Sequence, residues 1–165
     1  MYHAEISDFE TVKEIFYLHK KWFPHIRTDY MKRMIAKKNL ILENDVVITY
    51  NFYKRKQKIG DIQAFKDDCI LHQIAAKGKG TASDVLQRFF KFVNRRVYLS
   101  VRSDNEIAKN FYLKNNMKLV GKTSWAKGTL PGDVYVYNEN QVIKKYKRLA
   151  MGRVCLSDDK CIDII

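Results

Sequence analysis

One stretch decides the fold of this chain: Cys69-Ile70-Leu71-His72-Gln73-Ile74-Ala75-Ala76-Lys77-Gly78-Lys79-Gly80-Thr81-Ala82. Its first part is a short, largely apolar run, which is typical of a buried strand. Apolar residues then recur at helical spacing from Val85 to Val93, and a second apolar run follows from Val97 to Val101. The stretch therefore predicts a strand–helix–strand unit, with parallel strands joined by a right-handed crossover.

The segment from Lys77 to Ala82 predicts an anion-binding loop. The first amide groups of a helix have no acceptor within the helix, and the helix dipole favours negative charge near them. Gly78 and Gly80 let the backbone approach a phosphate closely, and Lys77 and Lys79 add positive charge.

Two widespread phosphate-binding motifs do not fit this loop. The nucleoside-triphosphate motif GxxxxGK[ST] fails because Gln73 stands in place of its first glycine and Gly80 follows Lys79. The dinucleotide motif GxGxxG fails because Ser83 stands in place of its third glycine. The segment therefore belongs to neither of these two classes of phosphate-binding loop.

A third motif does fit. Lys77-Gly78-Lys79-Gly80-Thr81-Ala82 resembles the [Q/R]xxGx[G/A] pyrophosphate loop of the Gcn5-related N-acetyltransferase (GNAT) superfamily, with lysine in the first position. Asn105-Glu106-Ile107-Ala108-Lys109-Asn110-Phe111-Tyr112-Leu113-Lys114-Asn115-Asn116-Met117 looks like the family's Asn-x-x-Ala-x-x-Phe-Tyr-x-Lys-x-Gly-Phe segment. Asn116 replaces a glycine there, and asparagine tolerates the left-handed conformation. The resemblance covers about residues 5–138 and is strongest over 70–121.

The resemblance implies an α/β (α+β) fold, with a central mixed, splayed β-sheet flanked by helices. It also implies acetyl-coenzyme A, or another acyl-coenzyme A, as the co-substrate. The pantetheine arm would pair with the strand near Ile74 and Ala76, and the pyrophosphate would lie on the amides of Gly78 to Ala82. Asn105 would face the pantetheine from the other side. The implied coenzyme-binding residues are Ile74, Ala76, Lys77, Gly78, Lys79, Gly80, Thr81, Ala82 and Asn105.

The implied reaction is attack of a neutral amine on the thioester. Tyr112 would lie near the sulfur, and a tyrosine is protonated at neutral pH, so it is the candidate acid for the departing thiolate. The backbone amide after a β-bulge of the strand would polarise the carbonyl. His72 is the candidate base, and a purely structural role for it remains open. Asp68, Ser100 and a chain of water molecules are the alternatives.

The remaining elements are expected to support this centre. Helices are predicted from residue 9 to 23, where Pro24 ends the first, and from residue 28 or 29 onward. Strands are predicted at 40–42, 46–53, 61–65, 118–125 and 133–137. The basic segment 54–58 reads as a loop, and Pro131-Gly132 as the turn between the last two strands.

The chain is expected to form a single acyl-coenzyme A N-acyltransferase domain over residues 1–138. Residues 139–165 are expected to form a basic C-terminal helix and a short tail that packs on this domain or extends it. The cysteines are Cys69, Cys155 and Cys161, an odd number, so at least one thiol is unpaired within the chain. Two free thiols are also expected at Cys155 and Cys161, because a cytoplasmic, reducing location is expected. No metal site and no membrane segment are expected.

The charge bears on the acceptor. Lys and Arg number 31 and Asp and Glu 18, which gives a formal net charge of +13. Such a field attracts polyanions, and aromatic residues lie among the basic ones, so a nucleic acid or a nucleic-acid-associated acceptor is favoured. The alternatives are a catalytically inactive GNAT-fold module that binds coenzyme A or nucleic acid, and an acetyltransferase for an ordinary protein or small amine. The sequence leaves the oligomeric state open.

Overall fold

The computed structural model describes residues 1–138, 153–157 and 160–163. The helices are η1 (Ile6–Asp8), α1 (Phe9–Leu18), α2 (Thr28–Ala36), α3 (Ala82–Val93) and α4 (Glu106–Lys114). The strands are β1 (Leu40–Glu43), β2 (Val46–Phe52), β3 (Gln57–Ile59), β4 (Ile62–Ala64), β5 (Cys69–Ala76), β6 (Val97–Arg102), β7 (Lys118–Trp125), β8 (Leu130–Tyr137), β9 (Arg153–Ser157) and β10 (Lys160–Asp163).

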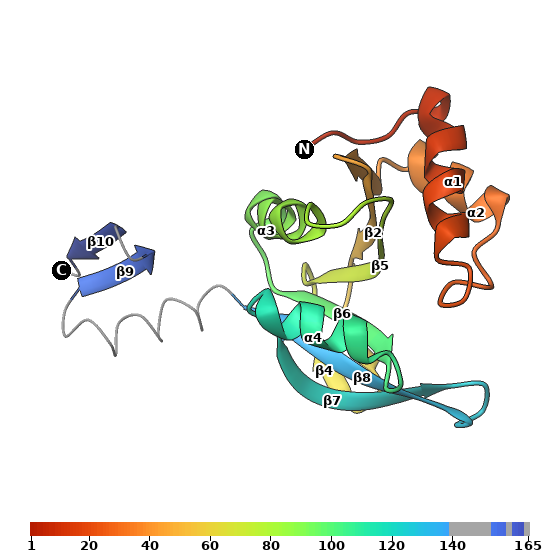
Figure 1. Ribbon diagram of the computed structural model, residues 1–165. Coiled ribbons are helices and arrows are strands. Elements are labelled where there is room, and N and C mark those ends of the chain that lie inside the picture. The colour runs from red at the N-terminus through yellow and green to blue at the C-terminus, as the bar shows by residue number, and fades with distance from the viewer. Residues whose placement is uncertain (139–152, 158–159, 164–165) are drawn as a thin grey trace.

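The central sheet has the strand order β1-β2-β5-β6-β8-β7 (Figure 1). The β5–β6 pair is parallel, and the other neighbours in this sheet are antiparallel. The predicted strand–helix–strand unit is therefore present, with α3 as its crossover. Because the connection lies at the centre of the sheet, it divides the sheet into an N-terminal half, β1-β2-β5, and a C-terminal half, β6-β8-β7.

Three hydrophobic clusters hold the layers together. The largest joins the sheet to α3 and α4 and contains Phe89, Phe90 and Tyr112. A second joins the N-terminal half to α1 and α2, through residues such as Phe16 and Met31. Figure 1 shows α1 and α2 on one side of β2 and β5, and α3 on the other. The sheet is thus covered on both faces, which agrees with its nearly continuous apolar strands.

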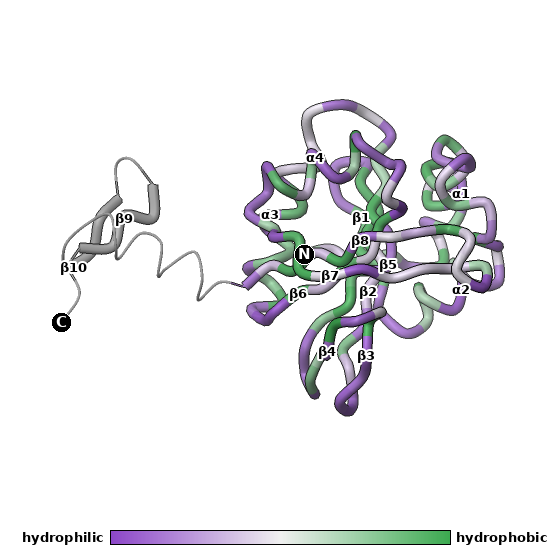
Figure 2. Tube along the Cα trace, turned by 90° about the horizontal axis from the view of Figure 1, so that it is seen from below, coloured by the Kyte–Doolittle hydropathy of each residue, from purple (hydrophilic) through white to green (hydrophobic). Residues whose placement is uncertain are grey.

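The third cluster lies under a small β3–β4 hairpin. Ile59 and Ala64 of the hairpin pack with Tyr98 of β6 and Val134 of β8. The hairpin projects from the rest of the fold, and its outer ends have hydrophilic colours in Figure 2. Strand β3 was not predicted, because a three-residue strand with one buried side chain has little pattern of its own. Its pairing with β4 depends on the tertiary contact below it.

Two predicted boundaries are wrong. The first helix ends at Leu18 rather than at residue 23, and the following segment turns across the end of the sheet. The turn between β7 and β8 comprises residues 126–129, whereas Pro131 lies inside β8. Proline is tolerated there because the β6–β8 pairing ends at Gly132, and the one backbone hydrogen bond of Pro131 on that edge uses its carbonyl oxygen, which accepts from the Ser103 amide at 3.0 Å.

The chain beyond the sheet is described only in part. Strands β9 and β10 form a separate two-stranded antiparallel sheet, in which Cys155 and Cys161 are register partners. The predicted basic helix at 141–153 lies outside the described residues, apart from Arg153, which begins β9. No helix in the described ranges has the length and apolar character that a membrane crossing requires.

Candidate active site

Strands β5 and β6 separate after a short paired start. Their parallel register contains Cys69 opposite Val97 and Ile70 opposite Tyr98, and no pair follows these two. On the other edge of β5, Leu71 pairs with Tyr50 and Gln73 pairs with Thr49, so His72 is an extra, bulged residue. A bulge bends its strand, and it lies where the separation begins. The sheet is therefore splayed at its centre, as expected.

The free edge of β5 presents backbone groups to the gap. The Lys77 amide donates to Asp45 O at 2.9 Å, so this pair is a hydrogen-bonded one. Hydrogen-bonded and non-hydrogen-bonded pairs alternate along an antiparallel ladder. Ile74 and Ala76 are therefore non-bonded towards β2 and direct their N–H and C=O groups towards β6. This is the edge to which an extended amide-bearing molecule could add.

The segment between α1 and α2 spans the open end of the splay. His19, just after α1, forms a 2.7 Å hydrogen bond between its Nε2 and the Ala76 carbonyl oxygen at the end of β5. Trp22 lies under the Arg102 guanidinium at the end of β6, with 5.3 Å between the guanidinium carbon and the ring centroid. The sequence around His19 does not indicate this role, and only the tertiary contact reveals it.

The loop between β5 and α3 has unpaired amides. Among the described residues, no hydrogen-bond acceptor faces the backbone N–H groups of residues 78–82. Gly80 has φ +89°, and a Cβ atom at Gly78 or Gly80 would meet nothing within 4 Å, so the approach to the loop is open. Lys79 is exposed, and Lys77 forms a 3.0 Å ion pair with Glu14 of α1. Amides, helix dipole and lysine together suit an anionic group.

Helix α4 carries the second motif to the other side of the splay. Asn105 caps the helix, since its Oδ1 accepts a hydrogen bond from the Ala108 amide at 3.2 Å. Tyr112 is 8% exposed and packs in the largest cluster with Leu71 of β5 and Leu99 of β6. Burial raises the pKa of Tyr112. Its phenol therefore stays protonated at neutral pH.

The C-terminal end of α4 is tied to α3. The buried Asn115 donates from Nδ2 to Ser83 Oγ at 3.1 Å, and Gln87 Nε2 donates to Asn115 Oδ1 at 3.2 Å. Asn116 then has φ +66°, the left-handed conformation expected where the family has glycine. These contacts fix the helix that carries Tyr112 against the helix that begins at the amide-rich loop. Asn115 lies inside the second motif, but its sequence context did not indicate this role.

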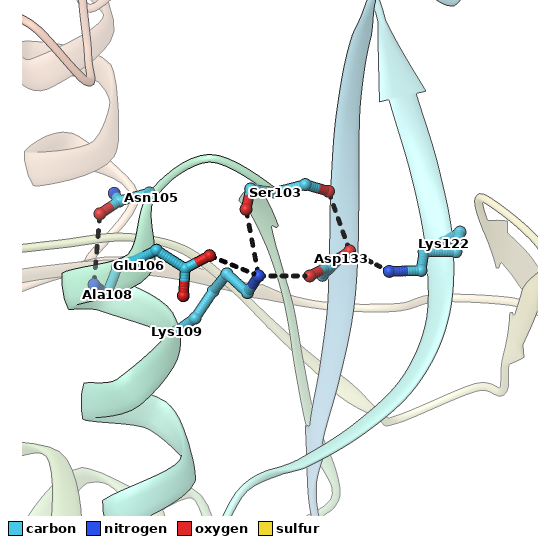
Figure 3. Close-up of polar contacts among 7 residues, drawn as sticks. All are labelled: Ser103, Asn105, Glu106, Ala108, Lys109, Lys122 and Asp133. Atoms are coloured by element: carbon cyan, nitrogen blue, oxygen red, sulfur yellow. Dashed lines mark hydrogen bonds and ion pairs between the residues drawn. The ribbon is translucent and has the colours of Figure 1, made fainter.

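The N-terminal end of α4 is tied to β8 by a buried carboxylate (Figure 3). Asp133 is 1% exposed, and its Oδ1 accepts hydrogen bonds from Lys122 Nζ at 2.6 Å and Ser103 Oγ at 2.9 Å. Lys109 Nζ lies 3.4 Å from its Oδ2 and 3.2 Å from Glu106 Oε1. Burial opposes ionisation of Asp133, but the bonds from Lys122, Ser103 and Lys109 outweigh it and hold its pKa below the usual range. It is therefore a structural anchor rather than a base.

A pocket of about 380 Å³ opens on the side of β5 that faces α2, opposite α3. Its walls come from α2, from the segment before it, and from His72 and Gln73 of β5. Arg27 and Arg33 line it, and neither has a carboxylate partner within 4 Å in the part of the chain that the structure describes. Asp29 is the acidic residue of the lining. The pocket thus offers two guanidinium groups and one carboxylate around an exposed imidazole.

His72 faces this pocket and bonds to β2. Asn51 Nδ2 lies 2.9 Å from His72 Nε2, and Asn39 Nδ2 donates to Asn51 Oδ1. Because an amide nitrogen only donates, His72 Nε2 accepts in this arrangement, which assigns the ring proton to Nδ1. Although the side chain is exposed, partial desolvation lowers the pKa of His72. The imidazole is therefore neutral at neutral pH and able to accept a proton.

The wall beside His72 is rigid. Gln73 Oε1 accepts a hydrogen bond from Tyr30 Oη at 2.9 Å, and Thr49 Oγ1 donates to the same oxygen. Thr49 is fully buried, so these bonds connect α2, β2 and β5 inside the fold. The sequence gives no indication of this role for Thr49 or Gln73, because they lie on separate strands and match no motif.

The remaining predicted candidates lie elsewhere. Asp68 precedes the paired start of β5, where Arg96 Nε lies 3.3 Å from its Oδ1 and the Phe65 amide bonds to its Oδ2. Ser100 is half-buried on β6 opposite Val134. Neither lines the pocket beside His72. No group of three or more His, Cys, Asp or Glu residues suited to a metal occurs among the residues described.

Comparison with known proteins identifies the fold. No protein-family model and no curated protein sequence matches the chain. Among solved structures, a GNAT-family acetyltransferase from Bacillus cereus ATCC 10987 is similar, with TM-score 0.65, 17% identity and coverage of 83% of this chain and 94% of that one. A ribosomal-protein-alanine N-acetyltransferase from Brucella melitensis is similar with TM-score 0.62 and 10% identity, over 82% of this chain and 97% of that one. Arabidopsis thaliana NAA60 in complex with acetyl-CoA is similar with TM-score 0.61 and 13% identity, over 82% of this chain and 96% of that one. The fold expected from the motifs is therefore confirmed.

Proposed function

We propose that this chain, which has the fold of the Gcn5-related N-acetyltransferases, transfers an acyl group from acyl-coenzyme A to an amine. One observation carries the proposal: β5 and β6 lose their pairing after Ile70 and Tyr98, and the free edge of β5 leads to a loop of unpaired amides. A molecule with amide groups along one part and phosphates at its end suits this sequence of features. Coenzyme A has that chemistry.

The donor would lie along β5. Its pantetheine amides would pair with the free backbone groups of Ile74 and Ala76, and its pyrophosphate would accept hydrogen bonds from the amides of residues 78–82. Lys77 and Lys79 would add positive charge, although the ion pair with Glu14 offsets part of the charge of Lys77. Asn105 would meet the pantetheine through its Nδ2, because its Oδ1 already caps α4. The Ala76 carbonyl is bonded to His19, so the coenzyme would have to share or displace that contact.

The chemistry needs one acid and one base. The amine nitrogen attacks the thioester carbonyl carbon, a C–N bond forms, the C–S bond breaks, and the thiolate leaves. Tyr112 would give its phenolic proton to that sulfur, because its raised pKa keeps it protonated and its helix faces the splay. The phenolate would then recover a proton from solvent.

His72 would take the proton from the attacking amine. It lies on the opposite side of β5 from α3 and lines the pocket from which an acceptor would approach. Its Nε2 lone pair is directed at Asn51, so the incoming amine would have to replace that hydrogen bond. Its neutral state at neutral pH leaves the lone pair available for this exchange.

The acceptor is proposed to carry negative charge near its amine. Arg27 and Arg33 line the pocket without a carboxylate partner among the described residues, so they can bind a phosphate or a carboxylate. Such a lining, together with the net charge of +13, favours a nucleic acid or a nucleic-acid-associated molecule over a simple cationic amine. An ordinary protein amine is the alternative, since one similar structure is a ribosomal-protein-alanine N-acetyltransferase.

Two measurements test the proposal. Calorimetric titration with acetyl-coenzyme A should show one site, and absence of binding at tens of micromolar, about the range of ordinary coenzyme affinities, would contradict the donor assignment. Nucleic acids, ribosomal proteins and polyamines should then be tested as acceptors, and mass spectrometry should detect an acylated product with at least one of them. Coenzyme binding without transfer to any of them would favour a catalytically inactive binding module instead.

A further inference from the structure

A second hollow lies beside the acceptor pocket. It has a volume of about 340 Å³ and lies at the end of β2. Its walls come from the end of β2, from the two ends of the segment that contains the β3–β4 hairpin, and from Asn39. The residues that line it are Asn39, Asn51, Phe52, Tyr53, Lys54, Lys66 and Asp67. None of these residues belongs to the coenzyme site, so the hollow is a separate feature of the surface.

The hollow shares a wall with the acceptor pocket. Asn51 lines the hollow and bonds to His72, which lines the pocket, with 2.9 Å between Asn51 Nδ2 and His72 Nε2. Asn39, also in the hollow, donates to the other end of the Asn51 side chain. One hydrogen-bonded residue therefore separates the two spaces. A polymeric molecule bound in the hollow would therefore lie next to the pocket.

The segment beside the hollow is strongly basic, and two of its lysines, Lys54 and Lys66, line the hollow itself. The hairpin segment carries five exposed cations, and none of them forms an ion pair within 4 Å among the described residues. These cations are Lys54, Arg55, Lys56, Lys58 and Lys66. Two carboxylates beside these cations are already paired with arginines: Asp67, which lines the hollow, with Arg95 at 3.6 Å, and Asp68 with Arg96 at 3.3 Å. The positive charge of the hairpin is therefore not neutralised by the protein itself.

Aromatic rings lie among these charges. Phe52 is 41% exposed, and the Arg95 guanidinium carbon lies 4.9 Å from its ring centroid. Phe65 is 47% exposed and has Lys56 Nζ at 5.9 Å from its centroid. Exposed rings next to cations are suited to stacking with nucleobases whose phosphates the cations neutralise. A duplex hides its base faces, so this combination favours a single strand.

We propose that the hollow at the end of β2, with the basic β3–β4 segment, binds single-stranded nucleic acid and holds it beside the acceptor pocket. This inference rests on the proposed function for the role of the neighbouring pocket, but the binding itself needs no coenzyme. The phosphates would contact Lys54 and Lys66, and a base would stack near Phe52.

Fluorescence anisotropy with a labelled oligo(dT) of about 12 nucleotides tests the binding without acyl-coenzyme A. Affinity should fall steeply between about 50 and 200 mM salt. In the Lys54→Gln, Lys66→Gln double variant, the slope of log affinity against log salt should become shallower by about 1.4, which corresponds to two lost phosphate contacts. Phe52→Leu should weaken binding about tenfold with little change in slope.

The matched control is Lys114→Gln with Lys118→Gln. These lysines are exposed on α4 and β7 and form no ion pair among the residues described, so the control makes the same change in net charge. It should keep the affinity and slope of the unmodified protein. If both double variants lose affinity equally, binding is a general effect of net charge and the proposed surface is wrong. Equal affinity for duplex DNA would also overturn it.

The outcome is separable from that of the proposed function. Nucleic-acid binding that follows the predicted variants, without calorimetric binding of acetyl-coenzyme A, would support the hollow and contradict acyl transfer. Coenzyme binding and transfer to a protein or polyamine, without oligonucleotide binding, would support acyl transfer and overturn the hollow.

Discussion

Tyr112 is the residue at which the proposed proton donation can be tested most directly. Tyr112→Phe keeps the ring in the hydrophobic cluster and removes only the hydroxyl. We expect turnover to fall about 100-fold, while the affinity for acetyl-coenzyme A stays the same. Because burial raises the pKa of Tyr112 above 10.0, the unmodified protein should keep the proposed acid protonated until the pH exceeds that value.

Tyr135 provides the control for this change. Its ring centroid lies 6.0 Å from that of Tyr112, and it is equally part of the cluster. Tyr135→Phe removes the same atom from a neighbouring position and should keep turnover. Steady-state kinetics and calorimetry on both variants separate loss of the acid from a disturbed cluster, and unchanged turnover in Tyr112→Phe would place the acid elsewhere.

His72 should set the acidic limb of the pH profile. Its pKa is lowered from 6.5, so the imidazole is neutral and basic above that pH and becomes protonated only in more acidic solution. We expect kcat/KM to fall with a midpoint below pH 6.5. His72→Gln should remove this limb and lower the plateau about 100-fold. His25 lines the same pocket, and His25→Gln should keep the limb. Persistence of the limb without His72 would exclude it as the base.

At the scale of elements, the loop before α3 depends on one glycine conformation. Gly80 has φ +89°, which an alanine adopts only with strain, although its Cβ would meet no neighbour. Gly80→Ala should therefore shift the loop and weaken binding of acetyl-coenzyme A about tenfold, an effect of about 1.4 kcal/mol. Gly78 has no positive φ and is equally open, so Gly78→Ala should be tolerated. Calorimetry on both variants makes the comparison, and equal losses would show that access rather than conformation matters.

The contact between α4 and β8 depends on the buried Asp133. Asp133→Asn leaves Lys109 and Lys122 without their carboxylate, and we expect the free energy of unfolding to fall by about 2 kcal/mol at neutral pH. The folded-state pKa of Asp133 lies below its usual 3.8. Its contribution is therefore complete above that value and is lost as the pH falls through the folded-state pKa. Urea unfolding at a series of pH values should show that the unfolding free energies of the unmodified protein and of Asp133→Asn approach each other as the pH falls.

Asp104 is the control for that experiment. It forms an ion pair with Arg102 at 2.8 Å, but its side chain is 62% exposed. Asp104→Asn should change the unfolding free energy far less, because exposed pairs are screened by solvent. A comparable loss in both variants would mean that burial of Asp133 adds nothing to its role.

At the scale of the whole molecule, the elements that would hold the donor were predictable from the sequence, and the pocket proposed for the acceptor was not. The loop at 77–82 and the segment from Asn105 to Tyr112 are continuous in sequence, so their residue types and spacing indicated their elements, and the fold followed. The pocket beside His72 is lined by α2, the segment before it and β5, and the buried Thr49 of β2 supports its wall through a hydrogen bond to Gln73. Neither Thr49 nor Gln73 matches a motif. Residues that meet only through the fold leave no local pattern.

The β3–β4 hairpin shows the same limit. Its basic segment was predicted as a loop, because alternating lysines hide the short strand, and nothing local indicates that it packs against β6 and β8. The packing relies on two glycines at the contact with β7. A Cβ at Gly121 would lie 2.3 Å from Asp61 Oδ1, and a Cβ at Gly60 would lie 2.1 Å from Lys122 O. The hairpin is therefore held close enough to β7 that no side chain fits at either position.

Gly60→Ala should consequently detach the hairpin from the sheet. The substitution combines a clash with the β7 backbone and a φ of +58°, so we expect a loss of about 3 kcal/mol in unfolding free energy. Gly128→Ala is the control, since Gly128 also has positive φ, at +88°, but no atom lies within 4 Å of its Cβ position. It should cost only about 1 kcal/mol. Urea unfolding gives both values, and hydrogen exchange should show faster exchange at Ile59 and Ile62 in Gly60→Ala alone. Equal losses in the two variants would attribute the effect to backbone strain and leave the hairpin contact without energetic support.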